Sequence, residues 1–338
     1  MMKLSKHIRP LLLCMICIFM LLPVKVFAAD AIDGDRDVNL TIKYTHNQTP
    51  ISGVQFDLYR VADANEYAEF TLAGDFKNYP VQVNGLTTEE WKTLAETLSA
   101  YASRDKLTPL DSGKTDSNGT LSFPNQQTSL KVGLYLVIGR QLSQDGYTYT
   151  TEPFLVSLPN LDTQSDTWTY DVTVTPKYTR KENSSTPDNQ TVKRKVLKVW
   201  KDDMEQSRPK KVIVQLLKDG AVYDTVTLNA ANNWRYTWKK LPEYNEDGSE
   251  AAWSVVEKEI EDYTVLITQE GVTFTVTNTY ASDESEDDTA TRKGKTNTSS
   301  KQKLPQTGVL WWPVPVLACG GILFLIVGKL SRKKNNHE

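Results

Sequence analysis

The chain has 338 residues and a formal net charge of −3, and 24% of its residues are charged. Its three cysteines, Cys14, Cys17 and Cys319, lie near the two ends, so the long stretch between them has no thiol for a disulfide. Residues 1–28 carry four positive charges and residues 308–338 carry a net charge of +3, so the residues between them carry a net charge of −10. An acidic segment of this kind argues against nucleic acid as a partner.

Residues 1–28 have the organisation of a secretory signal peptide. Three basic residues precede an apolar stretch over residues 11–23, and Val26-Phe27-Ala28 then matches the small-residue pattern of a signal peptidase site. This order is typical of a segment that signal peptidase removes, and we expect cleavage after Ala28. An uncleaved N-terminal anchor is the alternative, and the short apolar core disfavours it.

Residues 29–179 are expected to form a β-sandwich. Apolar and polar residues alternate over residues 54–59 and again over 134–138, which is the period of half-buried strands. Asp116-Ser117-Asn118-Gly119 precedes a strand-like run and predicts a hairpin turn. A calcium loop is the alternative for these residues, but the remaining ligands of such a loop are missing.

One helix, residues 87–103, is expected to interrupt these strands. Thr87 and Glu90 have the spacing of a capping box. The apolar residues that follow fall on one helical face: Trp91, Leu94, Ala95, Leu98 and Ala102. Such a face packs on a core more often than it binds a partner, so we expect it to cover the sheet.

Residues 180–192 lack apolar periodicity and are expected to be a linker. Residues 193–280 contain short strand-like runs separated by turn signals such as Asp219-Gly220, which predicts a second sandwich. The chain is therefore predicted to be all-β, with two tandem immunoglobulin-like β-sandwiches, the first with an inserted helix. Residues 281–303 have almost nothing to bury and are expected to be a disordered, wall-spanning linker.

Residues 304–338 contain three parts in a fixed order. Leu304-Pro305-Gln306-Thr307-Gly308 comes first, about 20 mostly apolar residues follow, enough for a membrane-spanning helix, and a basic tail ends the chain. The pentapeptide resembles the LPxTG signal of sortases, the cysteine transpeptidases of Gram-positive bacteria. The resemblance implies that a sortase thiolate attacks the Thr307 carbonyl and that an amine of the peptidoglycan precursor or of another protein resolves the acyl-enzyme. An ordinary membrane anchor is the alternative.

Several short motifs run through the second unit. They are Lys198-Val199-Trp200, Asp202-Asp203, Arg208-Pro209, Asp219-Gly220, Asn233-Trp234-Arg235-Tyr236, Leu241-Pro242, Trp253-Ser254-Val255-Val256-Glu257, Asp262-Tyr263 and Thr277-Asn278-Thr279-Tyr280. Together they resemble the CnaB family, the prealbumin-like sandwich of Gram-positive adhesin stalks and pilins. Domains of this family commonly form an intramolecular isopeptide bond, and the resemblance implies Lys198 as nucleophile, Asn278 as amide acceptor and Glu257 as assisting acid.

The apolar neighbours of Lys198 and Glu257 support this chemistry independently. Both residues lie within apolar strand-like runs, so folding should desolvate them and favour their neutral forms. A neutral amine attacks the Asn278 carbonyl while the protonated carboxyl donates to its oxygen, and ammonia leaves. A solvent-facing lysine and a surface salt-bridge glutamate are the alternatives.

The first unit looks like the N-terminal domains of sortase-assembled pilins. Its last strand, residues 168–177, resembles the pilin motif WxxxVxVYPK with Thr175 in place of the tyrosine, which implies Lys177 as the amine that accepts another subunit. An ordinary strand-end lysine is the alternative. Lys43 stands where such domains place a bond-forming lysine, but Gly139 replaces the usual glutamate and the terminal strand lacks the asparagine. We expect no isopeptide bond there unless Glu152 substitutes for the missing acid.

An enzyme is disfavoured because only three histidines exist, two of them near the processed ends, and no Gly-rich phosphate loop is present. We expect no cofactor and no metal site. The predicted protein is a secreted pilus subunit, basal or ancillary, that is covalently anchored to the Gram-positive cell wall. Its partners would be a sortase, the peptidoglycan precursor, other pilin subunits and a host surface ligand. The alternative is a free-standing adhesin that binds a host matrix ligand through its first domain.

Overall fold

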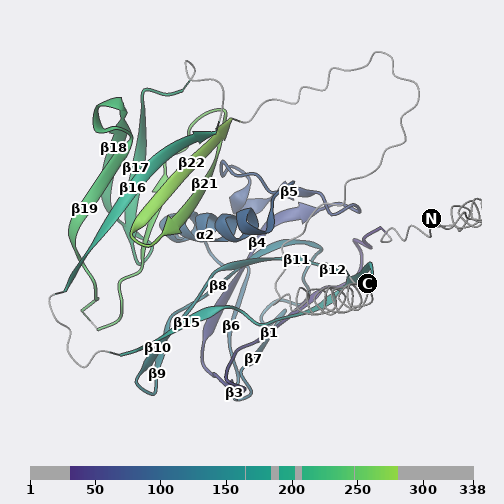
Figure 1. The fold of residues 1–338 in the computed structure, drawn as a ribbon. Coiled ribbons are helices and arrows are strands. Elements are labelled where there is room, and N and C mark those ends of the chain that lie inside the picture. The colour runs from purple at the N-terminus through teal and green to yellow at the C-terminus, as the bar shows by residue number, and fades with distance from the viewer. Residues whose placement is uncertain (1–30, 164, 184–189, 202–207, 247, 281–338) are drawn as a thin grey trace, which may run out of the picture.

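The computed structural model describes residues 31–163, 165–183, 190–201, 208–246 and 248–280. The expected signal peptide, the 281–303 tail and the sorting signal lie outside these residues. The part of the chain that the structure describes has no helix of the length and apolar character needed to cross a membrane. It consists mainly of strands arranged as two sandwich units, with one long helix, α2 (Thr88–Arg104), between them (Figure 1).

The strands and short helices of the first unit are β1 (Asn39–Lys43), β2 (Thr45–His46), β3 (Thr49–Pro50), β4 (Gln55–Ala64), β5 (Phe70–Leu72), η1 (Gly74–Phe76), β6 (Asp111–Lys114), β7 (Thr120–Phe123), β8 (Gly133–Gly139), β9 (Leu142–Gln144), β10 (Tyr147–Thr151), β11 (Phe154–Leu158), β12 (Asn160–Asp162), β13 (Thr167–Thr169), β14 (Asp171–Val174) and β15 (Tyr178–Glu182). Its main sheets have the orders β11-β8-β4-β5, with β6 beside β4, and β14-β1-β7. A third sheet, β15-β10-β9, extends the unit.

Alternating burial explains why β1 forms where it does. Leu40 and Ile42 are fully buried, whereas Asn39 and Lys43 face solvent. The strand pairs in parallel with β14 and antiparallel with β7, so the start and the end of the unit lie side by side. The expected strands around residues 54–59 and 134–138 are present as β4 and β8, which are neighbours in the main sheet.

The Asp116–Gly119 turn is present, but it does not join a hairpin. The Asp116 carboxylate accepts hydrogen bonds from the main-chain N–H groups of Asn118 and Thr120, each at 2.8 Å. The strands on either side separate, because β6 pairs with β4 whereas β7 pairs with β1. The turn therefore moves the chain from one sheet to the other.

The second unit is a sandwich of two sheets, as the sequence predicts. Its elements are β16 (Thr191–Lys201), β17 (Lys211–Lys218), β18 (Ala221–Asn229), η3 (Ala230–Asn232), β19 (Arg235–Pro242), β20 (Trp253–Glu257), β21 (Tyr263–Glu270) and β22 (Thr273–Tyr280). The sheets have the orders β19-β16-β22-β21 and β18-β17-β20. Both ends of the expected 180–192 linker lie in strands, because β15 pairs with β10 through residue 182 and β16 begins at Thr191.

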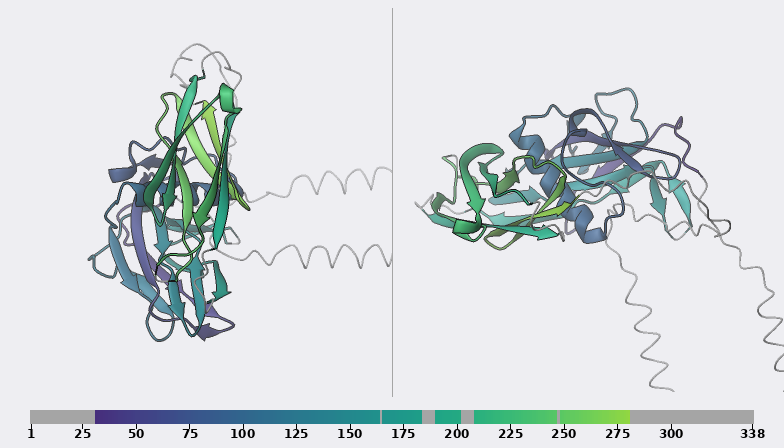
Figure 2. Two further views of the ribbon diagram at one scale, coloured as in Figure 1. Left: turned by 90° about the vertical axis from the view of Figure 1, so that its left-hand side faces the viewer. Right: turned by 90° about the horizontal axis from the view of Figure 1, so that it is seen from above.

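Helix α2 begins with the predicted capping box, since Thr87 Oγ1 accepts from the Glu90 N–H and the Glu90 carboxylate accepts from the Thr87 N–H. One side of the helix packs on β8 and β11 of its own unit, as expected. The opposite side packs on β20 and β21 of the second unit (Figures 1 and 2). The helix therefore contributes to the hydrophobic core of both units.

Gly119 offers a test of the sheet-switching turn. Its φ is +68°, and an added Cβ would lie 2.3 Å from the Tyr44 carbonyl oxygen. We expect Gly119→Ala to destabilise the first unit by more than about 2 kcal/mol, because backbone strain and a main-chain clash add. Gly53→Ala is the matched control, with φ +82° and no atom within 4 Å. Thermal unfolding should show the larger loss for Gly119→Ala, and equal shifts would contradict the clash.

Candidate functional site

Parallel pairing of β16 with β22 brings Lys198 and Asn278 onto one face. Lys198 lies opposite Val276 in the register, and Trp200 lies opposite Asn278. Side chains two positions apart on a strand point to the same side, so Lys198 and Asn278 both project from this sheet toward the interior. Asn278 lies two residues further along the strand pair than Lys198, a distance of about 7 Å that a lysine side chain can span.

Glu257 approaches from the facing sheet. It ends β20 after the buried Val255 and Val256, and its Oε1 lies 3.7 Å from Lys198 Nζ. Lys198, Glu257 and Asn278 are exposed by only 4%, 2% and 1%. The structure thus brings the three predicted residues together between the sheets, and the surface positions considered for Lys198 and Glu257 are wrong.

Burial controls the electrostatics of this cluster. Desolvation raises the pKa of Glu257, while the charge of Lys198 and a hydrogen bond from the Asn278 side chain oppose that rise. Within the described residues, Glu257 Oε1 and Asn278 Oδ1 are buried without a hydrogen-bond partner. Unpaired buried oxygens are uncommon in folded proteins, and here they belong to two of the three residues of the cluster.

Further contacts hold the Lys198 amine against the strand that bears Asn278. Nζ donates to the carbonyl oxygens of Val199 at 3.0 Å and of Val276 at 3.4 Å. The Trp200 ring centroid lies 4.0 Å from the same nitrogen, and Tyr263 packs edge-on against Trp200. The amine is therefore enclosed by the two paired strands and by aromatic rings.

The first unit has no comparable cluster around Lys43. Lys43 is exposed, and Glu152, considered as a substitute acid, lies at the surface with its carboxylate 3.6 Å from Lys92 Nζ. A Cβ at Gly139 would lie 2.7 Å from Thr151 Cβ and 2.8 Å from Phe56, so an acid at this position does not fit without rearrangement. The packing explains why glycine stands where a glutamate is usual.

The Lys177 side chain is exposed just beyond β14. Val172 and Val174 are buried and fix the strand, whereas Thr175 faces solvent, so the replaced tyrosine position is not part of the core. The Lys177 carbonyl accepts from the Glu152 N–H at 3.0 Å, which orders the main chain there. The sorting residues Leu304 to Gly308 lie outside the described residues.

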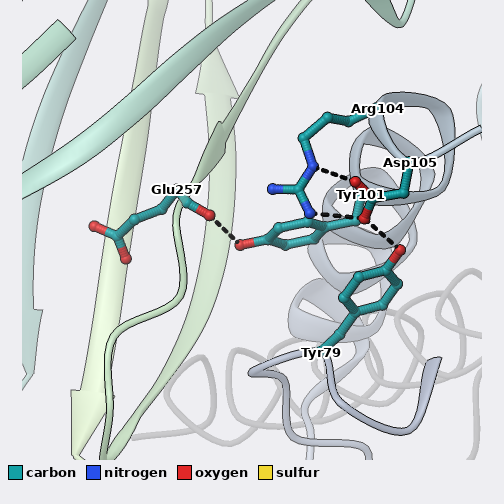
Figure 3. Close-up of polar contacts among 5 residues, drawn as sticks. All are labelled: Tyr79, Tyr101, Arg104, Asp105 and Glu257. Carbon is teal, nitrogen blue, oxygen red and sulfur yellow. Dashed lines mark hydrogen bonds and ion pairs between the residues drawn. The ribbon is translucent and has the colours of Figure 1, made fainter. Parts of the chain in front are cut away.

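The structure adds one residue that the sequence did not single out. Tyr101 of α2 donates its hydroxyl to the main-chain oxygen of Glu257 at 2.9 Å (Figure 3). In the same view the Glu257 carboxylate points away from the helix, into the second unit. Tyr101 is not among the residues predicted for the apolar stripe of α2, although it follows Leu94 by seven positions and Leu98 by three and so lies at the edge of that stripe. Its spacing indicates burial, but nothing local in the sequence marks it as a contact between the units.

Comparison with known proteins finds two family matches in this chain. Residues 25–179 match the Gram-positive pilin subunit D1, N-terminal domain, and residues 194–279 match the Cna protein B-type domain. The collagen adhesin of Staphylococcus aureus is 29% identical over 273 residues, which are 73% of this chain and 21% of the adhesin. The chain thus spans about a fifth of that relative's length.

Two solved structures are also similar. The major pilin SpaD of Corynebacterium diphtheriae has 20% identity and a TM-score of 0.28, covering 73% of this chain and 65% of that chain. A B repeat unit of the S. aureus collagen-binding surface protein has 17% identity and a TM-score of 0.25, covering 72% and 98%. The two domain matches and the relative support one assignment: the chain is a CnaB-type Gram-positive pilin or adhesin.

The burial of Lys198 predicts its response to an amine-acylating reagent. In the Asn278→Ala variant, which has no amide to attack, Lys198 should stay unmodified until denaturant is added, because its side chain is fully buried. Lys201, exposed at the end of the same strand, is the matched control and should react under native conditions, as should Lys177. Peptide mass mapping reads the result. Equal labelling of Lys198 and Lys201 in the native chain would contradict the buried site.

Proposed function

We propose that this chain is a wall-anchored pilus subunit whose second domain is closed by an isopeptide bond between Lys198 and Asn278. The observation that supports the bond most directly is the buried Lys198–Glu257 pair at 3.7 Å, with Asn278 on the strand beside Lys198. A buried ion pair is rarely a net source of stability, so a chemical role accounts for it better than a structural one.

The reaction exchanges one amide for another. Inside the sandwich a proton passes from Lys198 to Glu257, which gives a neutral amine and a neutral acid. Lys198 Nζ then attacks Asn278 Cγ while the Glu257 carboxyl donates to Oδ1. The new C–N bond forms, the bond to the amide nitrogen of Asn278 breaks, and ammonia leaves with a proton from the lysine amine. No oxidant or cofactor is required, and the step occurs once per molecule.

The bond would join the first strand of the domain to the last. By analogy with a disulfide, a loop of about 80 residues closed in this way removes roughly 4.5 kcal/mol of unfolded-chain entropy. Under tension, force that enters β16 would pass to β22 through a covalent link, and the strands between them would not be pulled apart. This use suits a cell-surface stalk without disulfides.

Intact mass tests the bond. The parent chain should weigh one ammonia less than its sequence mass, because the exchange expels one amide nitrogen. Lys198→Ala, Glu257→Ala and Asn278→Ala should each restore the full mass, while Lys201→Ala should keep the deficit. A parent chain of full sequence mass would show that the bond does not form.

The pH dependence of bond formation follows from the raised pKa of Glu257. The reactive pair holds one proton on the acid and none on the amine, so gaining a proton charges the amine and losing one removes the acid. We expect a bell-shaped rate profile whose alkaline limb lies above the ordinary glutamate range, because burial keeps the carboxyl protonated there. Ammonia release during refolding of unreacted chain measures it. A rate that rises steadily into the alkaline range would contradict the assisting acid.

The termini and Lys177 complete the proposal. Residues 1–28 would be removed on export, residues 281–303 would cross the wall, and a sortase would cleave after Thr307 and join the chain to peptidoglycan precursor. The exposed Lys177 would accept a preceding subunit, and the subunit would take a basal or ancillary position, a choice that rests on resemblance alone. The resemblance to a collagen adhesin supports a second candidate, an adhesin whose first domain binds a host matrix ligand.

A polymer ladder separates these two candidates. If Lys177 accepts another subunit, Lys177→Ala should abolish high-mass species in cell-wall digests, because no other amine occupies that place. Lys181→Ala is the control, since Lys181 is a nearby exposed lysine outside the motif. The adhesin candidate predicts identical digests for parent and Lys177→Ala, together with binding of matrix protein by the parent chain.

A further inference from the structure

Helix α2 covers two sheet edges of the second domain at once. β20 ends one sheet and β21 ends the other, and both pack against this helix. Figure 1 shows β21 beside α2. The Ile267 N–H on β21 donates to Thr97 Oγ1 at 3.0 Å, and the Val265 N–H donates to the Pro80 carbonyl at 2.7 Å. The first domain therefore satisfies main-chain groups that an edge strand would otherwise present to water.

At the β20 edge, the first domain contacts Glu257 itself, the residue that carries the assisting carboxyl. Tyr101 is 2% exposed, and its hydroxyl donates to the Glu257 carbonyl at 2.9 Å. Glu257 is the last residue of β20 and pairs with Val214 on the inner side of that strand. The main chain of Glu257 is thus held by β17 on one side and by Tyr101 of the first domain on the opposite side.

We propose that Tyr101 is a positioning residue for the Lys198–Asn278 bond, so that the second domain closes its cross-link efficiently only once α2 of the first domain has docked. The inference rests on the proposed isopeptide bond. The hydrogen bond fixes the end of β20, which sets the direction in which the Glu257 side chain enters the sandwich (Figure 3).

The neighbouring Tyr79 provides a matched control. Its ring stacks on Tyr101 with centroids 5.0 Å apart, and its hydroxyl donates to Asp105, which also pairs with Arg104 (Figure 3). Tyr79→Phe and Tyr101→Phe each remove one hydroxyl from the same ring stack. Only Tyr101→Phe removes a contact with Glu257.

The test measures the rate of ammonia loss by intact mass. Chain spanning residues 29–307 is isolated unfolded, and therefore unreacted, and then diluted into native buffer at a series of pH values. We expect Tyr101→Phe to slow the loss by about three- to tenfold, the worth of one hydrogen bond. The titratable groups that face Glu257 are Lys198 and Tyr101, with the polar Asn278 beside them. Without the hydroxyl, water enters to donate to the unpaired Glu257 carbonyl. This water also reduces the desolvation of the Glu257 carboxyl, so the alkaline limb should move to lower pH.

Tyr79→Phe should keep both the parent rate and the parent profile. Thr97→Val, which loosens the β21 edge without touching Glu257, should slow the reaction less and leave the profile in place. Thermal unfolding of each variant shows that the two domains still fold. A parent rate and profile in Tyr101→Phe would overturn the positioning role while the cross-link stands, and so would an identical effect of all three variants. A parent that loses no ammonia would instead overturn the cross-link itself.

Discussion

The parallel pairing of β16 with β22 is the constraint on which the chemistry proposed for the second domain depends. It places the first strand of the domain next to the last, so that Lys198 and Asn278 share one inward face. The facing sheet then supplies Glu257 at 3.7 Å from the amine, in an interior where a separated charge is costly. Desolvation, rather than any unusual residue, is the basis of the chemistry proposed for these three ordinary side chains.

The two domains solve the problem of a core without disulfides differently. The first relies on apolar packing, on pairs of neutral groups such as the 2.8 Å contact between the Tyr44 hydroxyl and Thr151 Oγ1, and on buried carboxylates whose partners are exposed or main-chain groups. Asp57 pairs in this way with the exposed Arg140, and Asp111 accepts from main-chain N–H groups. Thr151 and Phe56 occupy the space that an acid at position 139 would need. The second domain buries a charged pair instead, and a covalent link would turn that unfavourable burial into a lasting gain.

Helix α2 makes the arrangement of the two domains part of the same argument. Its polar groups bind main-chain atoms of β20 and β21, and its apolar side chains pack on both units. Exposed ion pairs such as Lys181–Glu250 add little to this interface, because both groups remain in water. Edge strands covered in this way are protected from pairing with other chains.

Local signals in the sequence determined the strands, the capping box of α2, the Asp116–Gly119 turn and the buried setting of Lys198 and Glu257, because each depends on residues a few positions apart. The same signals could not show that the turn changes sheets, that strands extend into both ends of the expected linker, or that Glu152 lies beside Lys92. Only the tertiary structure decided that the second side of α2 covers the edge bearing Glu257. That contact joins residues 156 positions apart. It forms because α2 packs between strands of both units, an arrangement that no short stretch of sequence specifies.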